Sequence, residues 1–243
     1  MEWKDNAMSL YPIFLKLEGH KVLIVGGGLI AEQKIEAVLR SATDVTVVSP
    51  QVTPRIRLWA HQRRIKYVSL AFRPGMTRGY FLVISCTDSE ETNRAVYKEA
   101  RESGALANAV DDPGYCDFYA PAVVSRGEFQ IAISTGGKSP ALSQNVRKQL
   151  EQDFGPEYES WTAWLGRMRD LIRKALPRTE RRKELLMLLA QCKPGKFAKQ
   201  HLLDRESLSY ESLNPELTGG HYGPVEKIRA GSQPEASIER ASA

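Results

Sequence analysis

The chain of 243 residues has 42% apolar side chains, enough for one large domain or two modest ones around a buried core. No apolar run approaches the roughly 20 residues of a membrane helix, and the polar start does not resemble a secretory signal, so we expect a cytoplasmic protein. The three cysteines are widely spaced and the four histidines are scattered, which argues against a disulfide framework and a metal site, and the net charge of +5 is moderate.

The first part of the chain predicts one strand–helix–strand unit. Residues 21–28 read KVLIVGGG, an apolar β-branched run that stops at three glycines, as a buried parallel strand entering a tight turn would. Residues 29–40 have apolar positions at helical spacing, and residues 44–49 read DVTVVS, a second strand that Pro50 ends. Together these elements have the length of a βαβ unit, about 30 residues.

The alternation of helix and strand continues to the end of the first half. In chain order we expect a helix over 56–64, strands over 65–72 and 79–86, a helix over 89–103 and a fifth strand over 105–110. Repeated alternation of this kind predicts an α/β fold, in which helices cover both faces of a Rossmann-type parallel sheet.

The pattern then changes to antiparallel and helical material. A hairpin is predicted from strands over 119–125 and 128–134, joined by a turn at Arg126 and Gly127. Ser139 and Pro140 are typical of a helix start. Three helices should therefore follow, the first running toward Phe154 and the others covering 157–175 and 179–191, before a tail with the composition of a disordered segment.

The glycines after the first strand match a dinucleotide-binding fingerprint in its required context. The spacing Gly26-x-Gly28-x-x-Ala31 follows a strand and opens a helix. In such turns the first glycine allows the bend, the second lets the backbone approach a pyrophosphate, and a small third residue packs the helix closely. The amino end of the helix would face the phosphates with free N–H groups. The alternative is a glycine-rich turn with a structural role alone.

The end of the second strand bears on the choice between NAD and NADP. The acidic residue that would bind the ribose hydroxyls of NAD is missing, because the strand ends in Ser49-Pro50-Gln51. Ser49 and Gln51 can still hydrogen-bond a ribose, and no basic residue stands closer than Arg55. We therefore expect NAD as the cofactor.

Several short stretches carry a resemblance to a known family. They are YPIF at 11–14, VGGG at 25–28, AEQK at 31–34, TD at 87–88, NAVD at 108–111, FYAPA at 118–122 and STGGKSPA at 134–141. In this order they resemble the precorrin-2 dehydrogenase and sirohydrochlorin ferrochelatase family, the amino-terminal module of sirohaem synthase.

The resemblance implies an organisation and a reaction. It implies an NAD-binding Rossmann domain over 1–113, an intertwined α+β dimerisation region over 114–150, a small helical region over 151–192 and a tail over 193–243. The expected reaction is the NAD-dependent oxidation of precorrin-2 to sirohydrochlorin by a homodimer. Some members also insert ferrous iron, and the sequence leaves that activity open. Cofactor contacts are expected from Gly26, Gly28, Leu29, Ile30, Ser49, Pro50, Gln51, Thr87 and Asp88.

Asp111 is the predicted catalytic base. It follows the fifth strand, and ligands of open α/β sheets collect outside the carboxyl ends of strands. It also matches the position of the family's functional aspartate. Asp112 is the rival candidate, and the structural alternative is that both aspartates only initiate the turn at Pro113 and Gly114.

The glycine-rich loop before the first of the three later helices is the predicted substrate site. The resemblance assigns Asn108, Ser134, Thr135, Gly136, Gly137 and Lys138 to the substrate. Flexible glycines, a lysine and a helix amino end are suited to the carboxylates of a tetrapyrrole. A helix-capping loop without ligand contact is the alternative, and Arg126 is expected to serve its hairpin turn.

Two other functions compete with this interpretation. Basic residues concentrate over 147–199, so a redox-sensing regulator that binds NAD and nucleic acid is the alternative from another class. No helix-turn-helix or aromatic-basic RNA motif supports it, and we expect neither a nucleic-acid nor a membrane partner. A reductase with a Tyr-x-x-x-Lys pair is excluded, because neither Tyr80 nor Tyr97 has a lysine four residues later.

Overall fold

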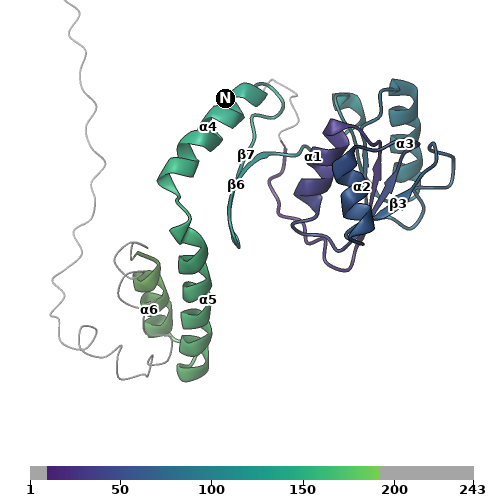
Figure 1. Cartoon of the computed structure of the whole chain (residues 1–243). Coiled ribbons are helices and arrows are strands. Elements are labelled where there is room, and N and C mark those ends of the chain that lie inside the picture. The colour runs from purple at the N-terminus through teal and green to yellow at the C-terminus, as the bar shows by residue number, and fades with distance from the viewer. Residues whose placement is uncertain (1–9, 192–243) are drawn as a thin grey trace, which may run out of the picture. The chain divides into compact units, whose positions relative to one another are not determined.

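The computed structural model describes residues 10–191, which fall into two compact units that divide between Gly155 and Pro156 (Figure 1). The predicted tail over 193–243 and Cys192 lie outside the described residues. None of the described helices is both long enough and apolar enough to cross a membrane.

The first unit contains a five-stranded sheet. Its spatial order is β3-β2-β1-β4-β5, and all neighbouring strands are parallel. The strands are β1 (Lys21–Val25), β2 (Asp44–Val48), β3 (Lys66–Val68), β4 (Leu82–Ser85) and β5 (Leu106–Ala109). The predicted α/β fold with a parallel sheet is confirmed. Because the chain crosses from β3 back to β4 beside β1, the order reverses at the carboxyl end of β1, where ligands of such sheets bind.

Helices cover both faces of this sheet. The helices α1 (Leu29–Val38) and α2 (Pro54–His61) share one core with Val22 and Ile24, whereas α3 (Glu90–Glu102) shares a second core with Leu23 and Val25 (Figure 1). Alternate residues of β1 thus enter opposite cores, as the period of a strand requires. The helix expected over 56–64 begins earlier, because the Ile56 N–H donates to the Thr53 hydroxyl at 3.3 Å and caps it.

The third strand is shorter than predicted. Strand β3 ends at Val68, and the apolar residues of the expected strand that follow it, up to Phe72, leave the sheet. The loop that continues to β4 is attached to α3 by the Glu99 carboxylate. This carboxylate accepts hydrogen bonds from the Gly75 N–H (2.8 Å), the Thr77 N–H (2.9 Å) and the Thr77 hydroxyl (2.6 Å).

We expect the hydrogen bonds to the Glu99 carboxylate to make the stability of the first unit sensitive to acid. Burial alone would raise the pKa of Glu99, but the hydrogen bonds from Thr77 and Gly75 lower it below its ordinary value of 4.5. A carboxylate with a lowered folded pKa contributes stability above the unfolded value of 4.5, and this contribution is lost as the pH falls through the folded pKa. Glu99→Gln should therefore lower the free energy of unfolding at pH 7 by about 1–3 kcal/mol.

Urea denaturation followed by circular dichroism measures this effect. The difference between Glu99→Gln and the wild type should shrink as the pH falls below 4.5, because the wild-type carboxyl becomes protonated as well. A difference that stays constant from neutral to acid pH would contradict the linkage. Glu102→Gln, at an exposed position of the same helix, is the matched control.

The predicted hairpin is present, with a shifted turn. Strands β6 (Ala122–Arg126) and β7 (Phe129–Ile133) are antiparallel, and Arg126 lies opposite Phe129. The turn is therefore Gly127-Glu128, with φ +59° at Gly127, and the expectation of a turn at Arg126 is wrong. The Arg126 guanidinium instead donates to the carbonyls of Phe154 (2.9 Å) and Glu151 (3.1 Å) at the end of α4 (Pro140–Asp153).

The described part of the second unit, residues 156–191, is a helical pair. It contains α5 (Glu157–Ala175) and α6 (Glu180–Gln191). Trp161 and Met168 are buried in it, and the rings of Trp161 and Trp164 stack at 4.9 Å. The helices predicted over 157–175 and 179–191 are thus present, whereas the domain bounds and the intertwining of 114–150 with a partner chain stay predictions.

Candidate functional site

The glycine turn after β1 is built by three glycines with different requirements. Gly26 has φ +126°, and a Cβ there would lie 2.5 Å from the Cys86 carbonyl oxygen. A Cβ at Gly27 would lie 2.0 Å from the carbonyl oxygen of Gln51, so this position admits no side chain. A Cβ at Gly28 would have no heavy atom within 4 Å. The first two glycines are therefore needed for packing, and only Gly28 borders open space.

That open space lies at the amino end of α1. Gly28 is the N-cap residue and provides no side-chain hydrogen bond, and the first N–H groups of a helix have no partner within it. Leu29 is 72% exposed and Ile30 45% exposed, whereas Ala31 is buried against the sheet. These residues fit a pyrophosphate for three reasons. No side chain covers the backbone at Gly28, the first N–H groups of α1 have no capping side chain, and the helix dipole favours an anion.

The loop after β2 is held by its own side chains. The buried Ser49 hydroxyl donates to the Gln51 carbonyl at 2.6 Å, and the Tyr67 hydroxyl contacts the Ser49 carbonyl at 3.1 Å. Ser49 therefore shapes the loop, while Pro50 and Gln51 are exposed.

Arg55, the basic residue nearest to this loop in the sequence, forms ion pairs with α1. Its guanidinium pairs with Glu32 (3.5 Å) and Glu36 (3.1 Å) of α1 and lies 5.0 Å from the centre of the Trp59 ring. The Thr53 hydroxyl donates to the Glu32 carboxylate at 2.6 Å. These contacts join the start of α2 to α1 and hold the Arg55 guanidinium against α1.

The loop after β4 is ordered by a buried amide that the sequence analysis missed. The Asn93 side chain of α3 accepts from the Thr87 N–H (3.0 Å) and donates to the Thr87 carbonyl (2.9 Å). This fixes Thr87 at the carboxyl edge of the sheet and leaves Asp88 exposed beside it. No motif in the sequence marks Asn93, which lies on the polar-looking start of a helix.

Cys86, directly after β4, is a partly buried thiol. It lies against the glycine turn, where its sulfur would be 3.1 Å from a Cβ at Gly26. Burial raises the pKa of Cys86 to about 12, and the nearby Lys34 charge lowers it only in part. The group is therefore protonated at neutral pH and serves as packing rather than as a nucleophile.

The two candidate aspartates after β5 have different environments. Asp111 is exposed and adopts the left-handed conformation, with φ +66°, and among residues 10–191 its carboxylate has no hydrogen-bond or ionic partner. Asp112 is half-buried and pairs with the Arg94 guanidinium at 2.9 Å, a contact that raises the pKa of Arg94. Asp112 thus joins the start of the 3₁₀ turn Pro113–Tyr115 to α3, whereas the Asp111 carboxylate has no such contact among the described residues.

The Asn108 side chain is engaged in a hydrogen bond within the protein. Its amide donates to the Phe118 carbonyl at 2.7 Å and so holds the segment after the turn against β5. Asp117 acts beside it, because its nearly buried carboxylate accepts from the Ala107 N–H (2.9 Å) and the Tyr97 hydroxyl (3.1 Å) and pairs with Arg101. Burial, followed by this contact with Asp117, raises the pKa of Tyr97.

The loop from Ser134 to Lys138 forms a compact turn ahead of α4. The Gly136 N–H donates to the Ser134 hydroxyl (3.1 Å), and the Ser139 N–H donates to the Thr135 hydroxyl (3.0 Å). Gly136 and Gly137 have φ +62° and +80°, which other residues adopt with strain. Lys138 is exposed, and the Ser139 hydroxyl caps α4 through the Leu142 N–H (3.2 Å).

The parallel sheet gathers most predicted site residues at one edge. The glycine turn, the Ser49 loop, Thr87 and Asp111 follow β1, β2, β4 and β5, and parallel strands place these ends together. Among the described residues, no hydrogen bond or ion pair joins the 134–138 loop to this edge. Within the same part of the chain, no group of three His, Cys, Asp or Glu side chains is placed to hold a metal ion.

Two family models match the chain. A model described as putative NAD(P)-binding matches residues 13–122, and one described as the central region of a sirohaem biosynthesis protein matches residues 126–153. The first match ends and the second begins within β6, the first strand of the hairpin.

Curated relatives and a solved structure agree with these models. The chain is 31% identical over 227 residues to a sirohaem synthase of Methylobacillus flagellatus, covering 92% of this chain and 48% of the relative. It is 36% identical over 166 residues to sirohaem synthase 1 of Aeromonas salmonicida, covering 68% and 36%. The chain thus spans half or less of these relatives. The structure of SirC, a precorrin-2 dehydrogenase, superposes with a TM-score of 0.64 at 28% identity, covering 79% of this chain and 98% of SirC.

Proposed function

We propose that the chain oxidises precorrin-2 to sirohydrochlorin with NAD. It belongs to the family of precorrin-2 dehydrogenases and sirohaem synthases. The observation that carries the proposal is the unpaired Asp111 carboxylate, which shares the carboxyl edge of the sheet with the glycine turn. A dehydrogenase needs a proton acceptor beside its cofactor, and Asp111 and the glycine turn would serve these two purposes.

The chain's own residues would hold the cofactor by its phosphates. The bare backbone at Gly28 and the N–H groups at the start of α1 would bind the pyrophosphate, while Gln51 and Thr87 flank the same edge. When bound, NAD supplies the hydride acceptor of the reaction.

Asp111 would remove the proton that leaves with substrate oxidation. Its left-handed backbone turns the chain sharply after β5, and its exposed carboxylate is free to accept a proton. Asp112 lacks this freedom because Arg94 occupies its carboxylate. The same proton transfer would serve ferrous iron insertion, in which the pyrrole nitrogens lose protons, so iron is kept as a second substrate to be tested.

Peripheral carboxylates of the tetrapyrrole would bind at the loop from Ser134 to Lys138. The positive φ angles of Gly136 and Gly137 leave the backbone without side chains on this turn, and Lys138 is exposed. The amino end of α4 adds partial positive charge. A homodimer in the cytoplasm is part of the proposal.

Anaerobic absorbance spectroscopy tests the function. Enzymatically generated precorrin-2 is mixed with the full chain and NAD, and ferrous iron is then added, each step beside a protein-free control. Formation of sirohydrochlorin only with protein and dinucleotide supports the dehydrogenase, and faster loss of sirohydrochlorin with iron supports the chelatase. No oxidation with either NAD or NADP would overturn the proposal and favour the NAD-binding regulator.

A further inference from the structure

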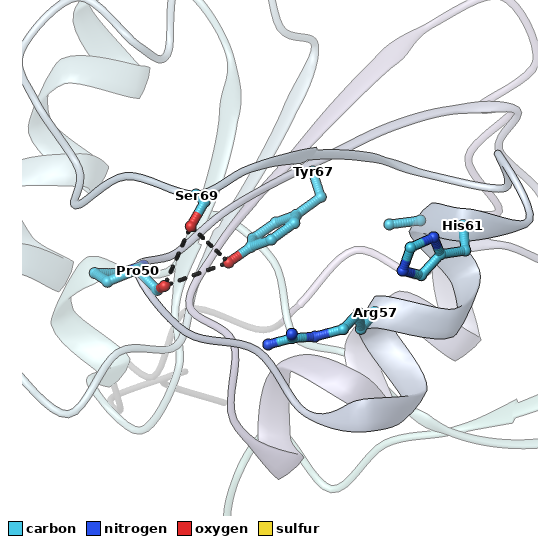
Figure 2. Close-up of a pocket in the computed structure, with 6 residues that line it drawn as sticks. Pro50, Arg57, His61, Tyr67 and Ser69 are labelled. Carbon is cyan, nitrogen blue, oxygen red and sulfur yellow. Dashed lines mark hydrogen bonds between the residues drawn. The ribbon is translucent and has the colours of Figure 1, made fainter.

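A cationic pocket lies beside the ribose position and has no role in the function proposed so far. It has a volume of about 450 Å³ and opens between α2 and β3 (Figure 2). Its six lining residues are Pro50, Arg57, Ala60, His61, Tyr67 and Ser69. Two of the six carry basic side chains and none is acidic, so the pocket suits an anion.

The hydroxyl side of the pocket is fixed. Figure 2 shows Tyr67 and Ser69 directed toward Pro50 on one side, with Arg57 and His61 projecting from α2 on the other. The Tyr67 and Ser69 hydroxyls lie 3.2 Å apart, and each lies 3.4 Å from the Pro50 carbonyl oxygen. Ser69 is exposed and its hydroxyl can turn to donate to a ligand.

The two basic side chains of the pocket have no hydrogen-bond or ionic partner among the described residues. Among the described residues, no acceptor or carboxylate contacts the Arg57 guanidinium or the His61 ring. Arg55, two residues earlier in α2 and therefore on another side of the helix, has two glutamate partners instead. A guanidinium without a partner, in a pocket whose lining includes two hydroxyls and no carboxylate, favours a phosphate group as its ligand.

The location of the pocket indicates which phosphate group it would bind. Pro50 and Ser69 each follow the carboxyl end of a strand, β2 and β3, and Arg57 lies in the first turns of the helix that begins after the Ser49 loop. In Rossmann folds the ribose of the adenosine half lies at the end of the second strand. There an acidic residue selects NAD, and a nearby arginine accommodates the 2′-phosphate of NADP. This chain has no acidic residue at that strand end.

We infer that the pocket of Arg57, His61 and Ser69 binds the 2′-phosphate of NADP, so that the chain accepts NADP in addition to NAD. The inference rests on the proposed function, since it assumes a dinucleotide on the glycine turn. It replaces the sequence-based preference for NAD with a site that tolerates both cofactors.

Binding of NADP and NAD to the full chain, measured by calorimetry without tetrapyrrole, tests the pocket. The wild type should bind NADP at least as tightly as NAD. Arg57→Ala should weaken NADP binding by about tenfold to a hundredfold, the effect of losing a hydrogen-bonded charge, and leave NAD affinity unchanged. Arg57→Lys should retain part of the NADP affinity, because it keeps the charge without the planar fork.

The controls separate this inference from the dehydrogenase. Arg40→Ala removes an exposed arginine just beyond α1 and should change neither affinity. Tenfold weaker binding of NADP than NAD by the wild type, or equal weakening of both dinucleotides by Arg57→Ala, would overturn the pocket assignment and leave the NAD-dependent activity standing. Failure to bind either dinucleotide would overturn both proposals.

Discussion

Asp111→Asn lowers the rate of precorrin-2 oxidation by about a hundredfold or more, because the variant cannot accept the proton that a general base removes. Asparagine is the substitution of choice, since Asp111 has φ +66° and asparagine adopts the left-handed conformation readily. The backbone turn after β5 should therefore persist. NAD affinity, measured by calorimetry, should remain at the wild-type value, because the glycine turn lies on another strand end.

Asp112→Asn is the matched control for this prediction. It weakens the contact with Arg94 but leaves the Asp111 carboxylate in place, so we expect a small loss of stability and nearly normal turnover. An inactive Asp112→Asn beside an active Asp111→Asn would reverse the assignment of the base.

Gly27→Ala and Gly28→Ala should fail in different ways. The new Cβ at position 27 would lie 2.0 Å from the Gln51 carbonyl oxygen and 2.7 Å from the Ser49 hydroxyl, so the loop must move. We expect the free energy of unfolding to fall by about 3 kcal/mol, as in other overpacked sites, and dinucleotide binding to be lost with it.

Gly28→Ala should lose dinucleotide binding without unfolding. Its backbone, at φ −81° and ψ −169°, is open to alanine, and nothing lies within 4 Å of the new Cβ. The cost as an N-cap residue is about 1 kcal/mol at most. The methyl group would instead occupy the space in which the backbone approaches a pyrophosphate.

Urea unfolding and calorimetric binding of NAD, applied to both glycine variants, separate the two effects. Normal NAD affinity in a folded Gly28→Ala would show that the cofactor does not approach this backbone. Wild-type stability of Gly27→Ala would show that the loop of Gln51 can give way.

The class of the fold, and the edge of the sheet at which we expect ligands, both follow from local patterns in the sequence. Buried parallel strands are continuous apolar runs, as in KVLIV of β1, and the glycines that end this run also mark the turn, so both signals are local. Asp111 was predicted for the same reason, because the end of a strand can be located in the sequence without knowing the neighbouring strands.

Which side chains at that edge lack a partner depends on contacts between segments that are far apart in the sequence. Ser49 has its hydroxyl on the Gln51 carbonyl, Arg55 pairs with α1, and Asp112 pairs with Arg94, whereas Asp111 and Arg57 have no such partner among the described residues. Arg55 and Glu36, or Asp112 and Arg94, are separated by many residues, and only the packing of helices against the sheet brings each pair together. A pattern in the chain reports the periodicity of an element, but not its neighbours across the sheet, and for that reason Gly27, Asn93 and the Arg57 pocket became visible only in the fold.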